Sequence, residues 1–556
     1  MKTASEAFLP IVLVRGFDPL ATSDRTTYYG WNDGTVYPHK VGENFIYEGM
    51  MIKFLKTGFL DPTRKGSEGE APRVYYQDAT NAICYKGSES VSLIGPDHPS
   101  AKKLQELLGG PEAGVELTGE QLGWLTGQVQ LDPGVASRYR GKSNTLWVYR
   151  FYDLKKRDLA VYAEQLKRVI DMIKAVTGAP SVNLVCHSMG GLIARYLLQK
   201  VYGDEAAAAE NVNKLVTLGT PHRGIAFQIA NASLPWELEF FNVDYLRGQF
   251  SRAQGEDLGD LRGTFDPRRV LCVVGTNHRD YIKAVSLLNQ VANWLQGREA
   301  NHSDGLVMQE SAALSGAYRA DVHKSHGGND SLITSREAFE LATRFFFGNV
   351  QVTVRCLRAH IHDRRRGFLE VVKGALDGVP EYYLGFSLKP RDIDFFLHYQ
   401  KEDSENCFGP YSKADISQEE FVRDRHDPSK NGVIFEGFLN SALGKFDTGR
   451  KNAGELKNMV VRFDIYVGER DSFLLGHSDQ KIVDAQSYIR FEPGETHWRI
   501  FFIPSLRPDV EPIEASHTSG NGSHRYRLSL DSRNFGENVD LELEIEFRER
   551  NTEGGS

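Results

Sequence analysis

The stretch Val182-Asn-Leu-Val-Cys-His-Ser-Met-Gly-Gly191 decides the fold of this 556-residue chain. An apolar run leads to a serine, and a methionine and two glycines separate that serine from the apolar segment 192–198. This order is typical of a buried strand, a sharp turn and a helix, a context that lifts a serine hydroxyl above a parallel sheet. The helix would point its amino terminus at developing negative charge. Ser188 is therefore the predicted nucleophile, against the alternative that it only caps a helix.

The segments around this stretch alternate between strands and helices up to about residue 348. Short apolar strands are expected at 11–15, 145–151, 182–187, 214–218 and 270–274. Apolar residues at the 3.6-residue period predict a helix that covers 159–173. Strands that are apolar on both faces and alternate with helices are typical of a parallel sheet covered on both sides. Thr334 and Glu337 predict a capping box for a last helix, which should end in a left-handed turn at Gly348.

Beyond Gly348 the pattern changes to a period of two. Val350, Val352 and Val354 alternate with polar residues, as do the apolar residues of 539–547. Further strands are expected at 382–388, 459–467, 498–503 and 526–530, and exposed loops at 403–430 and 516–524. Such alternation is typical of antiparallel sheets with one face on a core. We therefore predict an α/β domain at 1–348, built on a mostly parallel sheet, and an antiparallel β-sandwich domain at 349–556.

Composition and charge exclude several classes of protein. The chain has 66 Lys and Arg against 74 Asp and Glu, a net charge of −8, which does not favour a nucleic-acid partner. No run approaches the ~20 apolar residues that span a bilayer. The apolar start is broken by Pro10 and followed by Arg15, unlike a signal peptide. We expect a cytoplasmic protein, or one exported without a cleavable signal peptide, and not an integral membrane protein.

The five cysteines form no pair with metal-ligand spacing, and their number is odd. Cys186 and Cys272 stand in apolar runs that predict buried strands. Reduced thiols packed in the core are therefore expected, rather than a disulfide scaffold or a zinc site.

The nucleophile stretch and three further segments, in the same order, resemble the α/β-hydrolase superfamily, and within it the bacterial triacylglycerol lipases and the GPI inositol-deacylase-like lipases. The three segments are 11–17 (IVLVRGF), 217–224 (TLGTPHRG) and 303–307 (SDGLV). The resemblance covers residues 11 to about 348. It implies an α/β-hydrolase fold with cap or lid insertions at about 56–143 and 225–268. It also implies an oxyanion hole made by the backbone N–H groups of Phe17 and Met189.

Two residues depart from the pattern of these relatives. Cys186 takes the place of the usual first glycine of the nucleophile turn, where a larger residue would splay strand and helix slightly. Arg15 takes the place of the usual histidine before Gly16. Because the oxyanion donor is a backbone N–H group, any side chain is compatible with that function. Arg15 would either bind an anionic group of the substrate or form a structural salt bridge.

In these hydrolases the catalytic acid follows the serine in the chain, and the histidine follows the acid. Asp304 fits the Asp-Gly-Leu-Val pattern of the relatives and is the predicted acid. Asp257, Asp260 and Asp280 lie in polar stretches, where they are more simply solvated. They remain the alternatives.

His326 is the predicted base, because two glycines follow it and a loop there would lead into the last helix. His323 is the alternative base. His187 and His222 lie in segments that shape the nucleophile turn and the pocket wall in the relatives, and both are expected to be structural.

The insertion before the strand at 270 mixes apolar and acidic residues at 234–241. Hydrolases carry lids or pocket walls in this position. A lid would present Trp236, Phe240 and Phe241 to a lipid surface. A buried cap helix that packs on the core is an equally weighted alternative.

The resemblance implies a carboxylic ester hydrolase, that is a lipase, an esterase or a phospholipase, which needs no cofactor and no metal. Its expected partners are acyl-ester or lipid substrates and, peripherally, lipid surfaces. The alternatives are another acyl-transfer enzyme (an acyltransferase, thioesterase or amidase) and a hydrolase fold that binds without catalysis. The β domain is expected either to be a C2-like or other lipid-docking module or only to stabilise the hydrolase part.

Overall fold

The structure, a computed structural model, divides into two compact units. The first comprises Met1–Ala317 with Lys324–Phe339, and the second comprises Tyr318–His323 with Glu340–Ser556. The residues described are 8–16, 49–61, 72–80, 82–85, 129–131, 133–149, 151, 158–225, 241–251, 253, 255–279, 302–327, 330–362, 380–391, 393–400, 406–416, 426–439, 459–473, 476–494, 497–505, 509–520, 522–535 and 539–550. The domain boundary at Gly348 stays a prediction.

A parallel sheet forms the centre of the first unit. Its strands are β1 (Ile11–Val14), β4 (Gln77–Asp78), β7 (Thr145–Tyr149), β8 (Val182–His187), β9 (Val212–Leu218) and β10 (Val270–Gly275). Within this unit they lie in the order β10-β9-β8-β1-β7-β4, and all neighbouring pairs are parallel. The strand that precedes Ser188 thus has β1 on one side and β9 on the other. The predicted α/β architecture is confirmed.

Helices connect these strands. The long helix α5 (Leu159–Thr177) begins after Asp158, whose side chain accepts a hydrogen bond from Ala160 N, and ends at Gly178 in the left-handed conformation. After the nucleophile turn, α6 (Met189–Tyr196) continues into a π-helical segment, η3 (Leu197–Tyr202). The helix expected at 192–198 therefore starts earlier and changes its hydrogen-bonding pattern before it ends. The remaining elements of this unit are α1 (Met50–Lys56), β2 (Phe59–Leu60), β3 (Arg73–Val74), β5 (Ile83–Tyr85), β6 (Val129–Leu131), α4 (Pro133–Tyr139), α7 (Glu205–Asn211), α8 (Val243–Phe250) and η5 (Pro267–Arg269).

The last helix of the α/β pattern, α10 (Arg336–Phe347), is capped by a different residue from the one expected. Ser335 Oγ accepts a hydrogen bond of 3.0 Å from Ala338 N, whereas Thr334 Oγ1 donates to the backbone of the preceding turn. The predicted capping box was therefore wrong, because two adjacent hydroxyl residues cannot be ranked as caps from their order alone. Gly348 follows the helix, but it does not have the positive φ that was expected.

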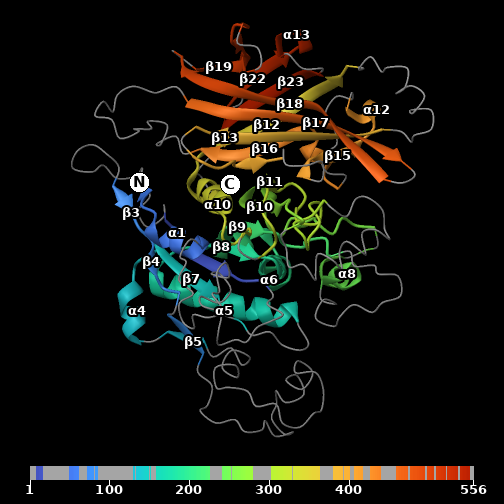
Figure 1. The fold of residues 1–556 in the computed structure, drawn as a ribbon. Coiled ribbons are helices and arrows are strands. Elements are labelled where there is room, and N and C mark those ends of the chain that lie inside the picture. The colour runs from blue at the N-terminus through green and yellow to red at the C-terminus, as the bar shows by residue number, and fades with distance from the viewer. Residues whose placement is uncertain are drawn as a thin grey trace, which may run out of the picture. The chain divides into compact units, whose positions relative to one another are not determined.

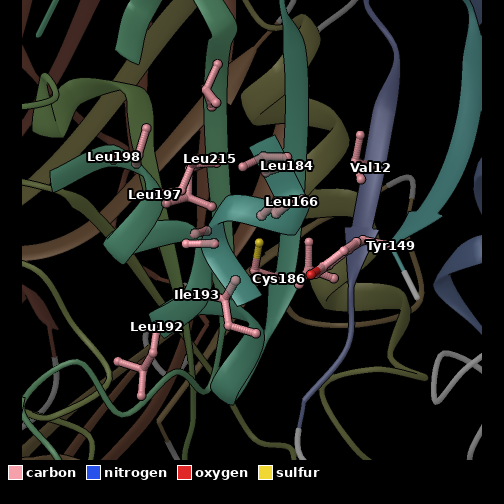
Figure 2. Close-up of a cluster of buried hydrophobic side chains, with 14 of the residues drawn as sticks. Val12, Tyr149, Leu166, Leu184, Cys186, Leu192, Ile193, Leu197, Leu198 and Leu215 are labelled. Carbon is pink, nitrogen blue, oxygen red and sulfur yellow. The ribbon is translucent and has the colours of Figure 1, made fainter. Parts of the chain in front are cut away.

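Apolar side chains from both strands and helices form one core beneath the nucleophile turn. Val12 of β1, Leu184 of β8, Leu166 of α5 and Ile193 of α6 are fully buried in it (Figure 2). Cys186 lies in the same cluster, with no exposed surface. Burial of apolar surface is worth ~25 cal/mol per Å². The turn that carries Ser188 is therefore anchored by well-packed elements on each side.

The second unit contains two antiparallel sheets, whose strands are drawn in yellow to red in Figure 1. One sheet has the order β16-β12-β23-β22-β21, and the other has the order β14-β13-β17-β18-β19-β20, with β15 also paired to β13. Phe491 of β18 contacts Phe547 of β23 edge to face, with ring centroids 5.9 Å apart, so aromatic side chains of the two sheets meet. This is the predicted sandwich. The elements of the second unit are β11 (Tyr318–Val322), which belongs to neither of these two sheets, β12 (Val350–Ile361), β13 (Glu381–Pro390), β14 (His398–Tyr399), β15 (Phe408–Tyr411), α12 (Lys413–Ile416), η8 (Pro428–Lys430), β16 (Val433–Leu439), β17 (Met459–Phe473), β18 (Gly476–Pro493), β19 (Trp498–Pro504), β20 (Ile513–Glu514), β21 (Ser516–Gly520), β22 (Ser523–Leu530), α13 (Ser532–Phe535) and β23 (Val539–Glu549).

Two expected loops of this unit contain regular structure. The stretch 516–524 is part of a hairpin of β21 and β22, in which Ser516 pairs with Arg527 and Gly520 pairs with Ser523. The polar composition reflects an exposed edge strand that still has its backbone partners, so the loop prediction was wrong here. Short elements β15, α12 and η8 likewise lie within 403–430. Among the described residues, no helix is both long enough and apolar enough to cross a membrane.

Candidate active site

The turn after β8 is strained at Ser188. Its φ of 51° and ψ of −122° fall outside the regions that non-glycine residues usually adopt. Two backbone hydrogen bonds hold it: Ser188 N donates to Leu218 O, and Gly191 N donates to Ser188 O, each over 3.0 Å. Gly190 permits a close approach of β1, since a Cβ there would lie 2.5 Å from Arg15 O. Strand β9 and helix α6 therefore fix the serine in the strained conformation that the sequence predicts.

Ser188, His326 and Asp304 are joined in a row by hydrogen bonds. His326 Nε2 lies 2.9 Å from Ser188 Oγ, and His326 Nδ1 lies 2.8 Å from Asp304 Oδ2. All three side chains are buried, at 4% exposure or less. A carboxylate only accepts, so Nδ1 carries the proton and Nε2 is left to accept from the serine hydroxyl. This arrangement suits removal of the Ser188 proton.

The backbone also fixes the acid. Leu306 N and Val307 N donate to Asp304 Oδ1 over 3.0 and 2.7 Å, and His326 N donates to Asp304 O over 2.9 Å. The two carboxylate oxygens therefore have separate tasks, because Oδ1 is held by the acid's own loop and Oδ2 by the histidine. The acid's own loop and the histidine therefore orient the carboxylate.

The alternative acids and the alternative base make other contacts. Asp257 pairs with Arg223 at 3.1 Å, and the Asp260 side chain accepts from Arg262 N over 2.7 Å. His323 belongs to the second unit, where its Nδ1 lies 3.4 Å from Asn406 Nδ2. Asp280 lies outside the described residues.

Arg15 is engaged by the protein itself. Its guanidinium donates to Gly16 O and Phe151 O over 3.0 Å each and lies over the Phe151 ring, 4.3 Å from the centroid. Carbonyl oxygens and an aromatic face hold the cation here. These contacts favour a structural function for Arg15 over the binding of a substrate anion.

Of the predicted oxyanion donors and lid residues, the structure describes Met189 and Phe241. Met189 is the first residue of α6, a position whose N–H group has no acceptor within the helix. Phe17, Trp236 and Phe240 lie outside the described residues. Phe241 is 2% exposed and packs in the core of the first unit, so for this residue the buried alternative holds and the exposed lid face does not.

Two other histidines near the site are buried. His222 has no exposed surface, and burial, followed by the charges of Arg195 and Arg223, holds its pKa well below the ordinary value. Its Nε2 lies 3.3 Å from Thr217 Oγ1, which fits the expected structural function. His187 was also expected to be structural, but its Nε2 lies 2.9 Å from the backbone oxygen of His326. The sequence contains no signal for this long-range contact beyond the position of His187 next to the serine.

Among the described residues, no group of three or more His, Cys, Asp or Glu side chains is arranged to hold a metal ion. Four cysteines, at 186, 272, 356 and 407, are buried and form no disulfide among the described residues. The functional groups that converge at the turn are therefore the hydroxyl, the imidazole and the carboxylate.

Comparison with known proteins finds similarity over part of the chain. Residues 152–244 match the PGAP1-like alpha/beta domain. Over 64 residues the chain is 44% identical to triacylglycerol lipases of Pseudarthrobacter phenanthrenivorans and Burkholderia plantarii, which covers 12% of this chain and 18% and 16% of the relatives. The chain thus matches less than a fifth of the length of these lipases.

Solved structures that match this chain include the product of gene lin2722 of Listeria innocua and the phospholipase PlaB of Legionella pneumophila. The TM-scores are 0.28 and 0.27, at 13% and 12% identity, and the matches cover 61% and 64% of this chain and 93% and 89% of those chains. Residues 152–244 of this chain are thus similar to the PGAP1-like alpha/beta domain, and a segment of 64 residues is similar to triacylglycerol lipases.

Proposed function

We propose that this chain is a serine hydrolase that cleaves carboxylic esters of acyl lipids through an acyl-enzyme intermediate. The observation that carries the proposal is the row of hydrogen bonds from Ser188 Oγ through His326 to Asp304. The similarity to triacylglycerol lipases supports an acyl-ester substrate at the level of the family.

In the proposed first step, Ser188 Oγ bonds to the acyl carbon while His326 Nε2 takes the hydroxyl proton. Asp304 holds the imidazole in the required tautomer and stabilises its charged form. The backbone N–H groups of Phe17 and Met189 donate hydrogen bonds to the carbonyl oxygen, on which negative charge develops. His326 then gives its proton to the alcohol oxygen as the ester C–O bond breaks.

In the second step, His326 removes a proton from water, and the water oxygen attacks the acyl carbon of the ester on Ser188. The bond to Oγ breaks, the serine regains its proton, and the fatty acid leaves. Every proton is carried by the chain's own residues or by water, so the proposed reaction has no step that requires a cofactor.

The test is an assay with p-nitrophenyl esters of graded acyl length, with and without glycerol, on the full chain and on Ser188→Ala. We expect hydrolysis that depends on Ser188 and favours longer acyl chains. Transfer to glycerol in excess of hydrolysis would indicate an acyltransferase instead, and turnover at background would indicate a binding protein. Triacylglycerol emulsions and phosphatidylcholine vesicles, assayed side by side, distinguish a lipase from a phospholipase.

A further inference from the structure

His187 contacts three segments of the proposed active site. It immediately precedes Ser188 and is buried, with 7% of its surface exposed. Its Nε2 lies 2.9 Å from His326 O, and the two imidazole rings are 4.9 Å apart. On another side, a Cβ at Gly16 would lie 2.8 Å from His187 Nδ1, so the ring packs against the predicted oxyanion turn. One imidazole thus contacts the nucleophile turn, the base loop and the segment before Phe17.

The contact with the base loop fixes the tautomer of His187. A carbonyl oxygen only accepts hydrogen bonds, so Nε2 must carry the proton that it donates to His326 O. In the neutral ring, Nδ1 is then without a proton. The donor therefore points at the base loop, while the bare nitrogen faces Gly16.

With this bond, His326 is held at four atoms. Its ring nitrogens contact Ser188 and Asp304, its backbone N–H group donates to Asp304 O, and its backbone oxygen accepts from His187. The first three contacts involve only the proposed nucleophile and acid. The fourth is supplied by a side chain that has no proton to exchange with the substrate in the proposed mechanism.

We propose that His187 is a positioning residue, which holds the backbone of His326 so that the imidazole stays in line between Ser188 and Asp304. This inference rests on the function proposed above. It extends the predicted structural status of His187 to a specific action on the base. A loss of the donor lets the base loop shift, and small misplacements of a catalytic group lower turnover rather than binding.

His187 also lies next to His326, a residue that becomes charged during each cycle of the proposed mechanism. Burial, together with the nearby positive charge that His326 can acquire, lowers the pKa of His187 to about 3, against the opposing effect of its hydrogen bond to His326. The ring is therefore neutral at any pH at which an imidazole base can work. A neutral donor keeps its bond to the base loop throughout the cycle and adds no repulsion when His326 is protonated.

The test compares two substitutions of nearly equal shape in the full chain. In His187→Gln the amide nitrogen can replace Nε2 as the donor, whereas His187→Met fills the same space without a donor. We expect His187→Met to lower kcat about tenfold with KM within about twofold of the parent, and His187→Gln to restore most of the rate. His187→Asn, whose amide is too short to reach the carbonyl, should behave as His187→Met does. Equal rates for Gln and Met, or an effect on KM alone, would overturn the inference.

The same substitution made in a His326→Ala protein separates an effect on the position of His326 from general damage to the nucleophile turn. His326→Ala removes the base, so the addition of His187→Met should cause no further loss in the small remaining activity. A further tenfold loss there would show that His187 acts on Ser188 or the oxyanion turn instead. Thermal unfolding of each variant excludes loss of the fold as the cause.

A readout that needs no turnover keeps this inference apart from the proposed function. The proton between His326 Nδ1 and Asp304 should give a low-field resonance in the parent and in His187→Gln, and this resonance should shift or broaden in His187→Met. If the parent shows no Ser188-dependent ester hydrolysis but the resonance responds as expected, the proposed function fails and the positioning function stands. An unchanged resonance in His187→Met contradicts the positioning function whatever the activity is.

Discussion

Buried carboxylates in the two units have different partners. In the first unit, Asp304 is held by a histidine ring and by two backbone N–H groups of its own loop. In the second unit, Asp464 accepts two-pronged hydrogen bonds from Arg462, and Glu544 on β23 pairs with Arg527 on β22. A carboxylate that is paired with arginine is already neutralised and contributes to stability. One that is paired with an imidazole can stabilise a charge that appears only during a reaction.

The contrast teaches that burial alone does not identify a catalytic acid. Asp304 and Asp464 are each 1% exposed. What separates them is the hydrogen-bond partner of each carboxylate. Asp304 is linked through His326 to a strained serine, whereas Asp464 is paired with an arginine at the surface of a sheet. The variants below are chosen to break or sharpen this distinction.

The largest effect is expected at the base. His326→Ala should lower turnover ~10⁶-fold, as the loss of a triad histidine does in other serine hydrolases. His323→Ala, three residues earlier, should lower it only severalfold, because its contacts are to Asn406 and Tyr399 in the second unit. Steady-state rates on a short-chain ester check both. A larger loss for His323 than for His326 would mean that the wrong histidine is assigned.

A smaller loss is expected from the acid, and here the two units are compared directly. Asp304→Asn should lower kcat ~10⁴-fold with little change in melting temperature, because an amide favours the wrong imidazole tautomer. Asp464→Asn should leave kcat unchanged and lower the free energy of unfolding by ~2 kcal/mol through the weakened bonds to Arg462. Activity and thermal unfolding of both variants decide the matter. Similar behaviour of the two would contradict the distinction between the units.

Two left-handed glycines of the first unit give a subtler test. Gly219 has a φ of 55°, and a Cβ there would lie 2.7 Å from Asp304 Oδ2, whereas Gly263, at a φ of 68°, has open space around it. Alanine at either position should cost ~1 kcal/mol of backbone strain. Only Gly219→Ala should also displace the acid and lower kcat by about 10²-fold. An equal loss of activity in Gly263→Ala would point to strain as the common cause.

The smallest effect concerns pH and stability. Burial holds His222 neutral with a lowered pKa, whereas a histidine in the unfolded chain titrates near ~6.5. Below that pH the unfolded state binds more protons than the folded state, so the free energy of unfolding falls as the pH falls. His222→Gln should make this slope shallower, by at most ~1.4 kcal/mol per pH unit, as the pH falls below ~6.5. Denaturant unfolding at several pH values measures it, and parallel curves for parent and variant would refute it.

Much of the first unit could be predicted because its signals are local. The apolar run before Ser188 and the glycines after it predict strand, turn and helix within ten residues. The resemblance to the hydrolases favours Asp304 as the acid, and the two glycines after His326 favour it over His323. Features that depend on distant contacts could not be predicted. The bond from His187 to the base loop joins residues 139 positions apart, and the burial of Phe241 depends on the core that receives it.

The second unit was predictable in class but not in detail. Alternation at 350–354 and 539–547 identifies antiparallel strands, yet the polar run 516–524 pairs as a hairpin, because edge strands tolerate polar residues on both faces. Residues 318–323 cluster with this unit as well, although the sequence Tyr-Arg-Ala-Asp-Val of β11 is not among the expected strands. The lipid-docking function of this unit stays a prediction, which rates on emulsified and on soluble ester substrates test.

The central claim is that Ser188 is the nucleophile of an acyl-transfer reaction, and covalent labelling tests it most directly. A fluorophosphonate should bond to Ser188 Oγ with loss of fluoride, and mass spectrometry of the intact chain and its peptides should find one adduct per chain, at Ser188. Asp304→Asn should label far more slowly, and Ser188→Ala should not label. Labelling at another serine, or undiminished labelling of Ser188→Ala, would contradict the account.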